Sequence, residues 1–227
     1  MTERRVRHLA AALLASGLSG CLNLAWADGP HLACEGMGDG PAAEAKRIAA
    51  RAQGVVRRDG KHVLSVRTAQ GVLRFADKPP HDEPLSGDHY RFCDRRDGFI
   101  LLQRVDESDG TGVLIDEATG RKTDGGEEIL FSNDRRAYFA TMQPDGLDGQ
   151  RWTIRAVDGT PSWSGYSFIE KRKGEFDATL DTPAWTDSGE FTAMAQCLAN
   201  DKLRWKVKLT KVSGQWQWLP NRKCPAS

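Results

Sequence analysis

The 227-residue chain has no run of about 18 unbroken apolar residues, the length that a membrane-spanning helix needs. It has almost no net charge either, because 32 Lys and Arg face 31 Asp and Glu. Without a basic surplus there is no field to attract nucleic acid or an anionic lipid surface, so we expect neither as a partner. Low-complexity tracts are missing, and 39% hydrophobic residues suffice for a core, which excludes collagen-like, coiled-coil and disordered classes.

Common catalytic signatures are also missing. The chain has no GxSxG elbow, no SxxK, no HExxH, no GxxxxGK[ST] loop and no EF-hand spacing. Histidine is scarce: beyond the first 27 residues there are only His31, His62, His81 and His89, so a histidine-based nucleophile relay has little to work with. The sequence therefore leans against an enzyme, without deciding the question, and predicts no cofactor and no metal.

The N-terminal segment has the pattern of an export signal. Three arginines within the first seven residues form a basic region, and residues 9–18 form a short apolar stretch. Residues 25–27, Ala-Trp-Ala, then place small residues at the two positions that a signal peptidase reads. The pattern predicts a signal peptide over residues 1–27 and a single β-rich domain over residues 28–227.

A second processing site competes with the first. Residues 18–21, Leu-Ser-Gly-Cys, match a bacterial lipobox, in which the thiol of Cys21 accepts a diacylglyceryl group before cleavage. Residues 22–26 continue the apolar stretch, whereas lipoproteins usually have a polar tether there. Two locations therefore stay open: the periplasm, or the outer membrane through a lipid anchor on Cys21. That anchor would be the protein's one attachment to a membrane.

The remaining cysteines indicate an oxidising compartment. Setting Cys21 aside leaves an even number with no CxxC spacing, which argues against a zinc site or a redox pair. Three pairings are possible. We favour Cys34–Cys93 and Cys197–Cys224, because each ties a terminal segment to nearby strand structure. Each closed loop would stabilise the fold by about 3 to 4 kcal/mol.

One helix and a long series of strands are expected. Pro41 suits a first helical turn and Gly54 can end the helix. Alanines recur between them at helical spacing, so we expect an alanine face that packs closely against another element. From about residue 61 the period changes to two, with about 13 short strands. Asp97-Gly98 is a strong turn signal between two of them, and residues 203–210 form the cleanest strand.

Two segments resemble parts of a β-propeller blade. Residues 113–120, VLIDEATG, are similar to an outer strand with its turn, and residues 129–140, ILFSNDRRAYFA, are similar to an inner hairpin. The resemblance is best over residues 88–164 and is to the β-propeller-like repeats of bacterial periplasmic proteins or lipoproteins. It implies an all-β fold, a small or incomplete propeller-like meander of antiparallel hairpins with one short N-terminal helix. Aligned strand groups give units of about 40 residues, starting near Gln53, Asp88, Gly126 and Gly165.

The segment from Phe176 to Phe191 is the candidate partner-binding surface. We expect a long loop there, with Trp185 between Asp181 and Asp187. A rigid tryptophan among acidic residues is typical of a binding hot spot. The alternative is that Trp185 folds back onto the core, since all six tryptophans after the leader lie beyond residue 150 and predict a heavier core there.

The export signal, the single-domain size and the lack of catalytic motifs favour a binding protein. We expect an exported module, monomeric when free, that binds a protein partner in the cell envelope. An immunity or inhibitor protein against a cell-envelope hydrolase is the specific hypothesis. A first alternative is a metal-dependent hydrolase using the His81–His89 loop, where imidazoles and carboxylates crowd together. A second alternative is a scaffold component of the envelope.

Overall fold

In the part of the chain that the computed structural model describes, seventeen strands form four antiparallel sheets, and there is one helix. The all-β class with one short N-terminal helix is therefore confirmed. The predicted signal peptide and Cys21 lie outside the described part of the chain. The structure describes residues 30–34, 40–81, 87–106, 109–143, 149–172 and 175–225.

The sheets follow one another along the chain, and the predicted division into four units is confirmed. Apart from β1 (His31–Ala33), which joins the third sheet from the N-terminal segment, the sheets begin at residues 56, 88, 128 and 168. The first sheet follows α1 (Pro41–Arg51) and contains β2 (Val56–Arg58), β3 (Val63–Thr68) and β4 (Gly71–Ala76). The second contains β5 (Asp88–Arg96), β6 (Phe99–Asp106), β7 (Asp109–Asp116) and β8 (Lys122–Asp124).

The third and fourth sheets have five strands each. The third has the order β1 (His31–Ala33), β9 (Glu128–Phe131), β10 (Ala137–Met142), β11 (Arg151–Ala156) and β12 (Pro161–Tyr166). The fourth contains β13 (Phe168–Arg172), β14 (Glu175–Trp185), β15 (Phe191–Cys197), β16 (Asn200–Val212) and β17 (Gln215–Leu219). Apart from β1, which pairs with β9, neighbouring strands of each sheet are consecutive in the chain, as a meander requires.

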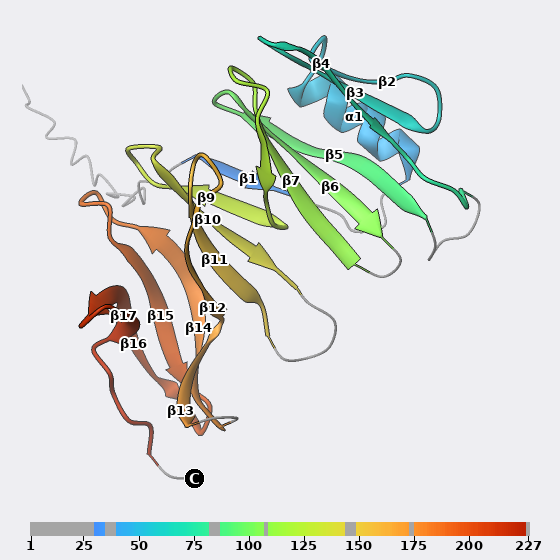
Figure 1. The fold of residues 1–227 in the computed structure, drawn as a ribbon. Helices are drawn as coiled ribbons and strands as arrows, with labels where there is room; N and C mark the ends of the chain where they lie inside the picture. The colour runs from blue at the N-terminus through green and yellow to red at the C-terminus, as the bar shows by residue number, and fades with distance from the viewer. Residues whose placement is uncertain are drawn as a thin grey trace, which may run out of the picture.

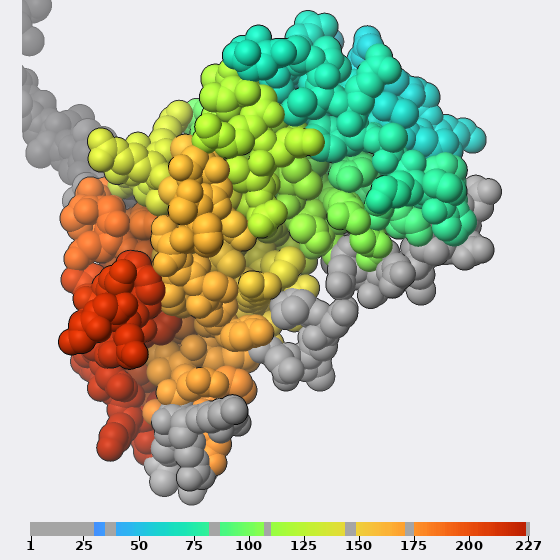
Figure 2. Space-filling model, in the orientation of Figure 1, coloured from blue at the N-terminus to red at the C-terminus, as the bar shows by residue number. Residues whose placement is uncertain are grey.

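The four sheets form an open row, with a core between each consecutive pair (Figure 1). The first and fourth sheets lie at opposite ends of the molecule, and Figure 2 shows the same succession on the surface. Strand β6 contributes to two cores, because Ile100 and Leu102 face the first sheet while Leu101 faces the third. Both faces of β6 are thus buried over residues 99–102, which accounts for the apolar run Phe-Ile-Leu-Leu at the start of this strand.

Glycine permits the closest approach between the second and third sheets. A Cβ atom on Gly126 would lie 2.1 Å from the carbonyl oxygen of Thr141, and one on Gly112 would lie 2.2 Å from the carbonyl oxygen of Gly126. Both positions therefore require a residue without a side chain, since the contacted atoms belong to backbone.

Both predicted disulfides are present. Cys34 follows β1 of the third sheet and bonds to Cys93 in β5 of the second sheet, so this bond joins two sheets. Cys224 bonds to Cys197 at the end of β15 and fixes the C-terminal segment to the fourth sheet. The physical reason for the preferred pairing, that each bond holds a terminal segment, is borne out.

Local predictions hold in part. Asp97 and Gly98 have φ of 53° and 85° and form the turn between β5 and β6, as predicted. Alternate burial of Trp205, Val207 and Leu209 in β16 is also confirmed. The loop expected from Phe176 to Phe191 is wrong, because β14 runs through to Trp185 and pairs with β15. No helix within the described residues is long and apolar enough to cross a membrane.

Removing either disulfide tests how the terminal segments are held. The bonded cysteines are 59 residues apart in Cys34–Cys93 and 27 in Cys197–Cys224. Loop-closure entropy predicts losses of about 4 kcal/mol for the Cys34→Ser/Cys93→Ser variant and about 3.5 kcal/mol for Cys197→Ser/Cys224→Ser. Urea unfolding of the two double variants measures both losses. Unchanged midpoints would show that the terminal segments are held by packing alone.

Candidate functional site

A groove of about 950 Å³ lies between α1 and the first sheet, and we call it the α1 groove. One wall is a face of the helix with Ala45, Ile48 and Ala49, and the other is β2 with the turn that follows it. Residues 89–91 of β5 also line it. Its volume is at the upper end of the range for small-molecule sites in proteins.

The groove exists because the alanine face of α1 is not covered. Ala45 and Ala49 are exposed and Ile48 is half-buried, so the expectation that this face packs closely is wrong. Ala52, at the helix end, is the one alanine of that face that is buried. Short side chains on α1 leave the space between the helix and β2 open.

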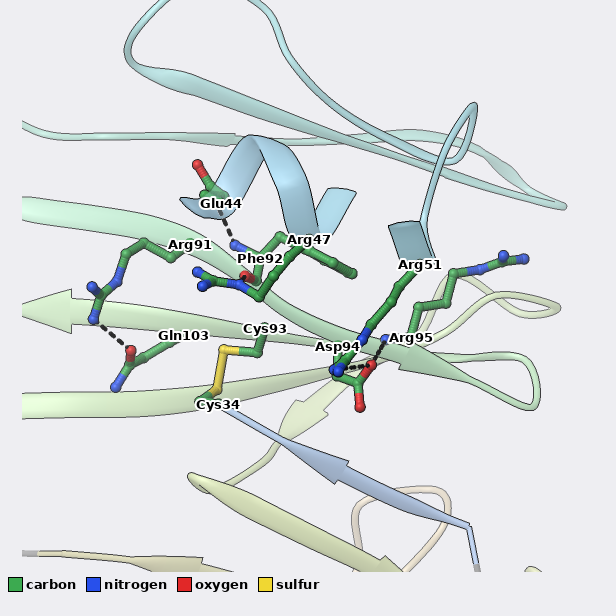
Figure 3. The surroundings of a disulfide bond; sticks show 10 residues. All are labelled: Cys34, Glu44, Arg47, Arg51, Arg91, Phe92, Cys93, Asp94, Arg95 and Gln103. Carbon is green, nitrogen blue, oxygen red and sulfur yellow. Dashed lines mark hydrogen bonds and ion pairs between the residues drawn. A yellow bond between two sulfur atoms is a disulfide. The ribbon is translucent and has the colours of Figure 1, made fainter. Parts of the chain in front are cut away.

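The helix is held instead by polar side chains on the edge strand β5 (Figure 3). Glu44 is 5% exposed, and its Oε1 accepts a hydrogen bond of 2.7 Å from the backbone N–H of Phe92. Arg47 donates from Nε to the carbonyl oxygen of Phe92 at 3.3 Å. Arg51 pairs with Asp94 at 3.1 Å. Side chains of α1 thus satisfy backbone groups that an edge strand otherwise leaves open.

The first sheet joins the same edge through Arg58 and Asp77. Arg58 of β2 donates to both carboxylate oxygens of Glu44, at 2.9 and 3.1 Å, and to the carbonyl oxygen of Tyr90. Asp77 accepts a 2.8 Å hydrogen bond from the N–H of Tyr90. We call Glu44, Arg47, Arg58 and Asp77 the β5-edge network. Glu44, Arg58 and Asp77 of this network line the groove, but their charged groups are already bound to backbone.

Histidines gather beside this network. Nδ1 of His62 lies 3.8 Å from Oδ2 of Asp77, and the ring of His62 stacks on that of His81 at 3.9 Å. His89 lines the groove from β5. Among the residues that the structure describes, no group of three or more His, Cys, Asp or Glu is placed to hold a metal ion. Asp82 and Glu83 of the expected metal loop lie outside those residues.

The three predicted partner-binding residues do not form one exposed surface. The indole N–H of Trp185 donates to the carbonyl oxygen of Leu130 at 2.9 Å, and its ring packs against Phe191. Trp185 therefore lies on the core, which was the alternative considered from the sequence. Both carboxylate oxygens of Asp181 accept hydrogen bonds from Nη2 of Arg204, at 2.7 and 2.8 Å.

Asp187 is the exposed member of the three. It sits in the turn between β14 and β15 and accepts a 3.1 Å hydrogen bond from Asn133, in the turn between β9 and β10. Turns of two neighbouring sheets therefore meet at this end of the row. A binding role for Asp181, Trp185 or Asp187 stays a prediction.

Sequence reasoning missed the residues that build the groove. The partners of Glu44 and Asp77 lie on β5, and Phe92 is 48 residues beyond Glu44, a distance that no local pattern reveals. Comparisons with protein-family models, with curated proteins and with solved structures found no match for this chain. The functional inference therefore rests on the groove and its chemistry.

Replacing Arg58 tests whether the β5-edge network stabilises the fold. Arg58→Ala leaves the buried carboxylate of Glu44 without its cationic partner. We therefore expect a loss of about 3 kcal/mol in the free energy of unfolding. The matched control is Arg57→Ala, because the Arg57 side chain is 67% exposed and pairs with Asp59 at the surface. Its loss should be about 0.5 kcal/mol. If urea unfolding gave equal losses of unfolding free energy for the two variants, the β5-edge network would stabilise the fold no more than a surface ion pair does.

Asp88 supplies a pH test of the same edge. The hydrogen bond from Lys78, and next that from Arg104, hold the pKa of Asp88 below its usual value. A lowered pKa in the folded state contributes stability above the unfolded pKa, about 3.9, that is lost as pH falls through the folded pKa. Asp88→Asn should therefore lose stability at pH 7 and show a weaker decline below pH 4.

The control for Asp88→Asn is Asp106→Asn. Asp106 also pairs with Arg104, but its side chain is 49% exposed against 6% for Asp88. We expect its stability profile between pH 2 and pH 7, measured by urea unfolding, to follow that of the unaltered protein. If the stability of Asp88→Asn fell below pH 4 as steeply as that of the unaltered protein, Asp88 would not be the source of the pH dependence.

Proposed function

We propose that the protein is an extracytoplasmic binding protein, which holds another molecule and does not transform it. The α1 groove carries this proposal. Its walls are mainly apolar, and the carboxylates of Glu44 and Asp77 are bound to backbone N–H groups of β5. These hydrogen bonds fix the shape of the groove. A ligand that enters it meets apolar side chains and the Arg and Lys side chains of the lining.

The compartment agrees with this function. Two disulfides indicate an oxidising location outside the cytoplasm. A finer location, in the periplasm or on the outer membrane through lipidated Cys21, is part of the proposal. It is supported by the export pattern and the lipobox of the N-terminal segment.

The specific form of the proposal is an immunity or inhibitor protein whose partner is a hydrolase of the cell envelope. The exposed turn with Asp187, beside the turn with Asn133, supports it, because turns fixed on a rigid sheet framework are common binding surfaces. The half-buried indole of Trp185 packs on the core beneath this turn and donates to the carbonyl oxygen of Leu130. Asp187, with Trp185 as its support, is therefore the centre of the proposed contact.

The metal-dependent hydrolase is the second candidate, although the described residues bring no three metal ligands together. Its one favourable observation is that the ring of His81 stacks on that of His62, which lies beside Asp77. Metal analysis of the purified protein decides it: a stoichiometric ion that a His81→Ala/His89→Ala variant loses would favour the hydrolase. The scaffold alternative predicts several envelope partners in crosslinking.

The turn is tested with a partner captured from periplasmic extract and then purified. Asp187→Lys should weaken binding of that partner at least tenfold, because it reverses the exposed charge of the contact. Asp201→Lys, the matched control in the β15–β16 hairpin, should bind as the unaltered protein does. Surface plasmon resonance measures both.

Trp185→Ala separates support from contact. We expect it to lower the free energy of unfolding by about 2 kcal/mol, because it empties part of the core.

If Asp187→Lys bound the partner with unchanged affinity, the turn would be removed from the proposal. Failure to capture any protein would contradict a protein partner.

A further inference from the structure

We propose that the tip of the β16–β17 hairpin enters the catalytic cleft of a glycoside hydrolase, with Trp216 as its apolar anchor and Lys211 beside the carboxylates of the cleft. Residues 211–217 form this segment, which we call the hairpin tip. The inference rests on the proposed function and deepens it, because it names the reaction class of the partner enzyme. It also names the segment that blocks that enzyme.

The hairpin tip extends beyond the paired part of β15. Lys208 is the last residue of β16 that pairs with β15, and β16 and β17 continue for four further residue pairs, to Val212 and Gln215. All residues of the tip are exposed, and β17 is the last strand of its sheet (Figure 1). Ser213 and Gly214 close the hairpin with φ of 50° and 85°, as in a tight two-residue turn. The tip is therefore narrow and fixed in shape.

Apolar side chains are open to solvent on both faces of the tip. Trp216 lies opposite Lys211 and is 40% exposed, and Val212, on the other face, is 37% exposed. The indole N–H of Trp216 donates to the carbonyl oxygen of Ser162 in β12 at 3.1 Å, which fixes the ring. Tryptophan is among the residues that dominate binding energy at interfaces, and a fixed ring loses little entropy on binding. Two open faces suit a cleft, which encloses the tip, better than a flat surface.

Lys211 gives the tip a positive charge. It is the one charged residue both in the hairpin beyond Lys208, residues 209–219, and in the neighbouring strand β12. Its Nζ lies 5.9 Å from the ring centre of Trp216, and no carboxylate of the described residues is within ion-pair distance of it. Glu190, in the adjacent β14–β15 turn, is bound to Lys208 at 2.6 Å. The surface around Trp216 therefore complements an acidic cleft.

Glycoside hydrolases have a cleft of this kind. They act through a pair of carboxyl groups that flank the scissile bond, and one of the pair is ionised before the reaction. The ammonium group of Lys211 is attracted to that carboxylate, and the attraction strengthens where water is excluded. The flat ring of Trp216 would then occupy a sugar position beside the pair. A cleft that holds a metal cation would instead repel Lys211.

Enzyme inhibition tests the inference. The purified protein, with both disulfides formed, is immobilised to retain its partner from periplasmic extract, and the retained partner is assayed on purified peptidoglycan. We expect release of reducing sugar ends, which the free protein inhibits in competition with the substrate. An oligomer of N-acetylglucosamine, which fills sugar positions of the cleft, should displace the protein from its partner.

Matched variants locate the apolar anchor. Trp216→Ala should raise the inhibition constant about thirtyfold, the effect expected of a hot-spot residue. Its control is Tyr166→Ala, because Tyr166 is 52% exposed but lies at the other end of β12 from Ser162. This control should inhibit as the unaltered protein does. Both substitutions replace exposed side chains, and near-UV circular dichroism checks that the core of each variant is intact.

Charge variants test the contact with the cleft carboxylates. Lys211→Glu should raise the inhibition constant about tenfold, because it places two negative charges together. Lys211→Arg keeps the positive charge and should retain most of the inhibition. Lys202→Glu makes the same charge reversal on an exposed residue at the other end of β16 and should change nothing.

The outcomes separate this inference from the proposed function. A retained partner that cleaves peptide bonds and no glycan would overturn the inference and leave the contact at the Asp187 turn standing. Unchanged inhibition in both Trp216→Ala and Lys211→Glu would overturn it in the same way. Retention of no protein would contradict the proposed protein partner itself, so the two failures are distinguishable.

Discussion

The ion pair between the buried Glu44 and the partly buried Arg58 lies on the edge of β5 that no strand covers, and the N-terminal half of the molecule depends on it. An edge strand exposes backbone donors and acceptors that would otherwise pair with another chain. Here the carboxylate of Glu44 accepts from Phe92, the guanidinium of Arg58 donates to Tyr90, and the two side chains bond to each other. One pair thereby fixes a helix, a strand and a sheet edge in a single arrangement.

The attachment of α1 to β5 through polar side chains leaves the alanine face of the helix uncovered. A helix that packs through an apolar stripe covers that stripe, but α1 is held through Glu44, Arg47 and Arg51. Its alanine side is left facing β2 across an open space. The groove is therefore produced by the way the helix is attached. A buried charge pair rarely adds net stability over an apolar one, so its value here lies in specifying the geometry.

Sequence reasoning succeeded where the determinants are local. The turn at Asp97-Gly98, the alternation in β16 and the helix after Pro41 follow from residues a few positions apart, and the four sheets follow from strand spacing. Of the three possible disulfide pairings, the right one could be predicted because each of its bonds ties a terminal segment to nearby strand structure. Each of these inferences needs no knowledge of distant contacts.

It failed where a residue's partner lies far along the chain. Glu44 looks like an ordinary helix-surface residue until Phe92 is brought to it, and Trp185 looks like a loop residue until Leu130 accepts its indole hydrogen. The groove could not be predicted for the same reason, since α1 and β2 are near in sequence but their separation is set by β5.

Amide hydrogen exchange of Phe92 and Tyr90 tests the account most directly. Both N–H groups lie on the outer side of an edge strand, yet they donate to the carboxylates of Glu44 and Asp77. We predict strong protection of both amides at neutral pH, with exchange of Phe92 at least a hundredfold faster in Glu44→Ala while the amide of Leu101, in the interior of the second sheet, stays protected. Rapid exchange of Phe92 in the unaltered protein would contradict the account, because it would show that the edge of β5 is open.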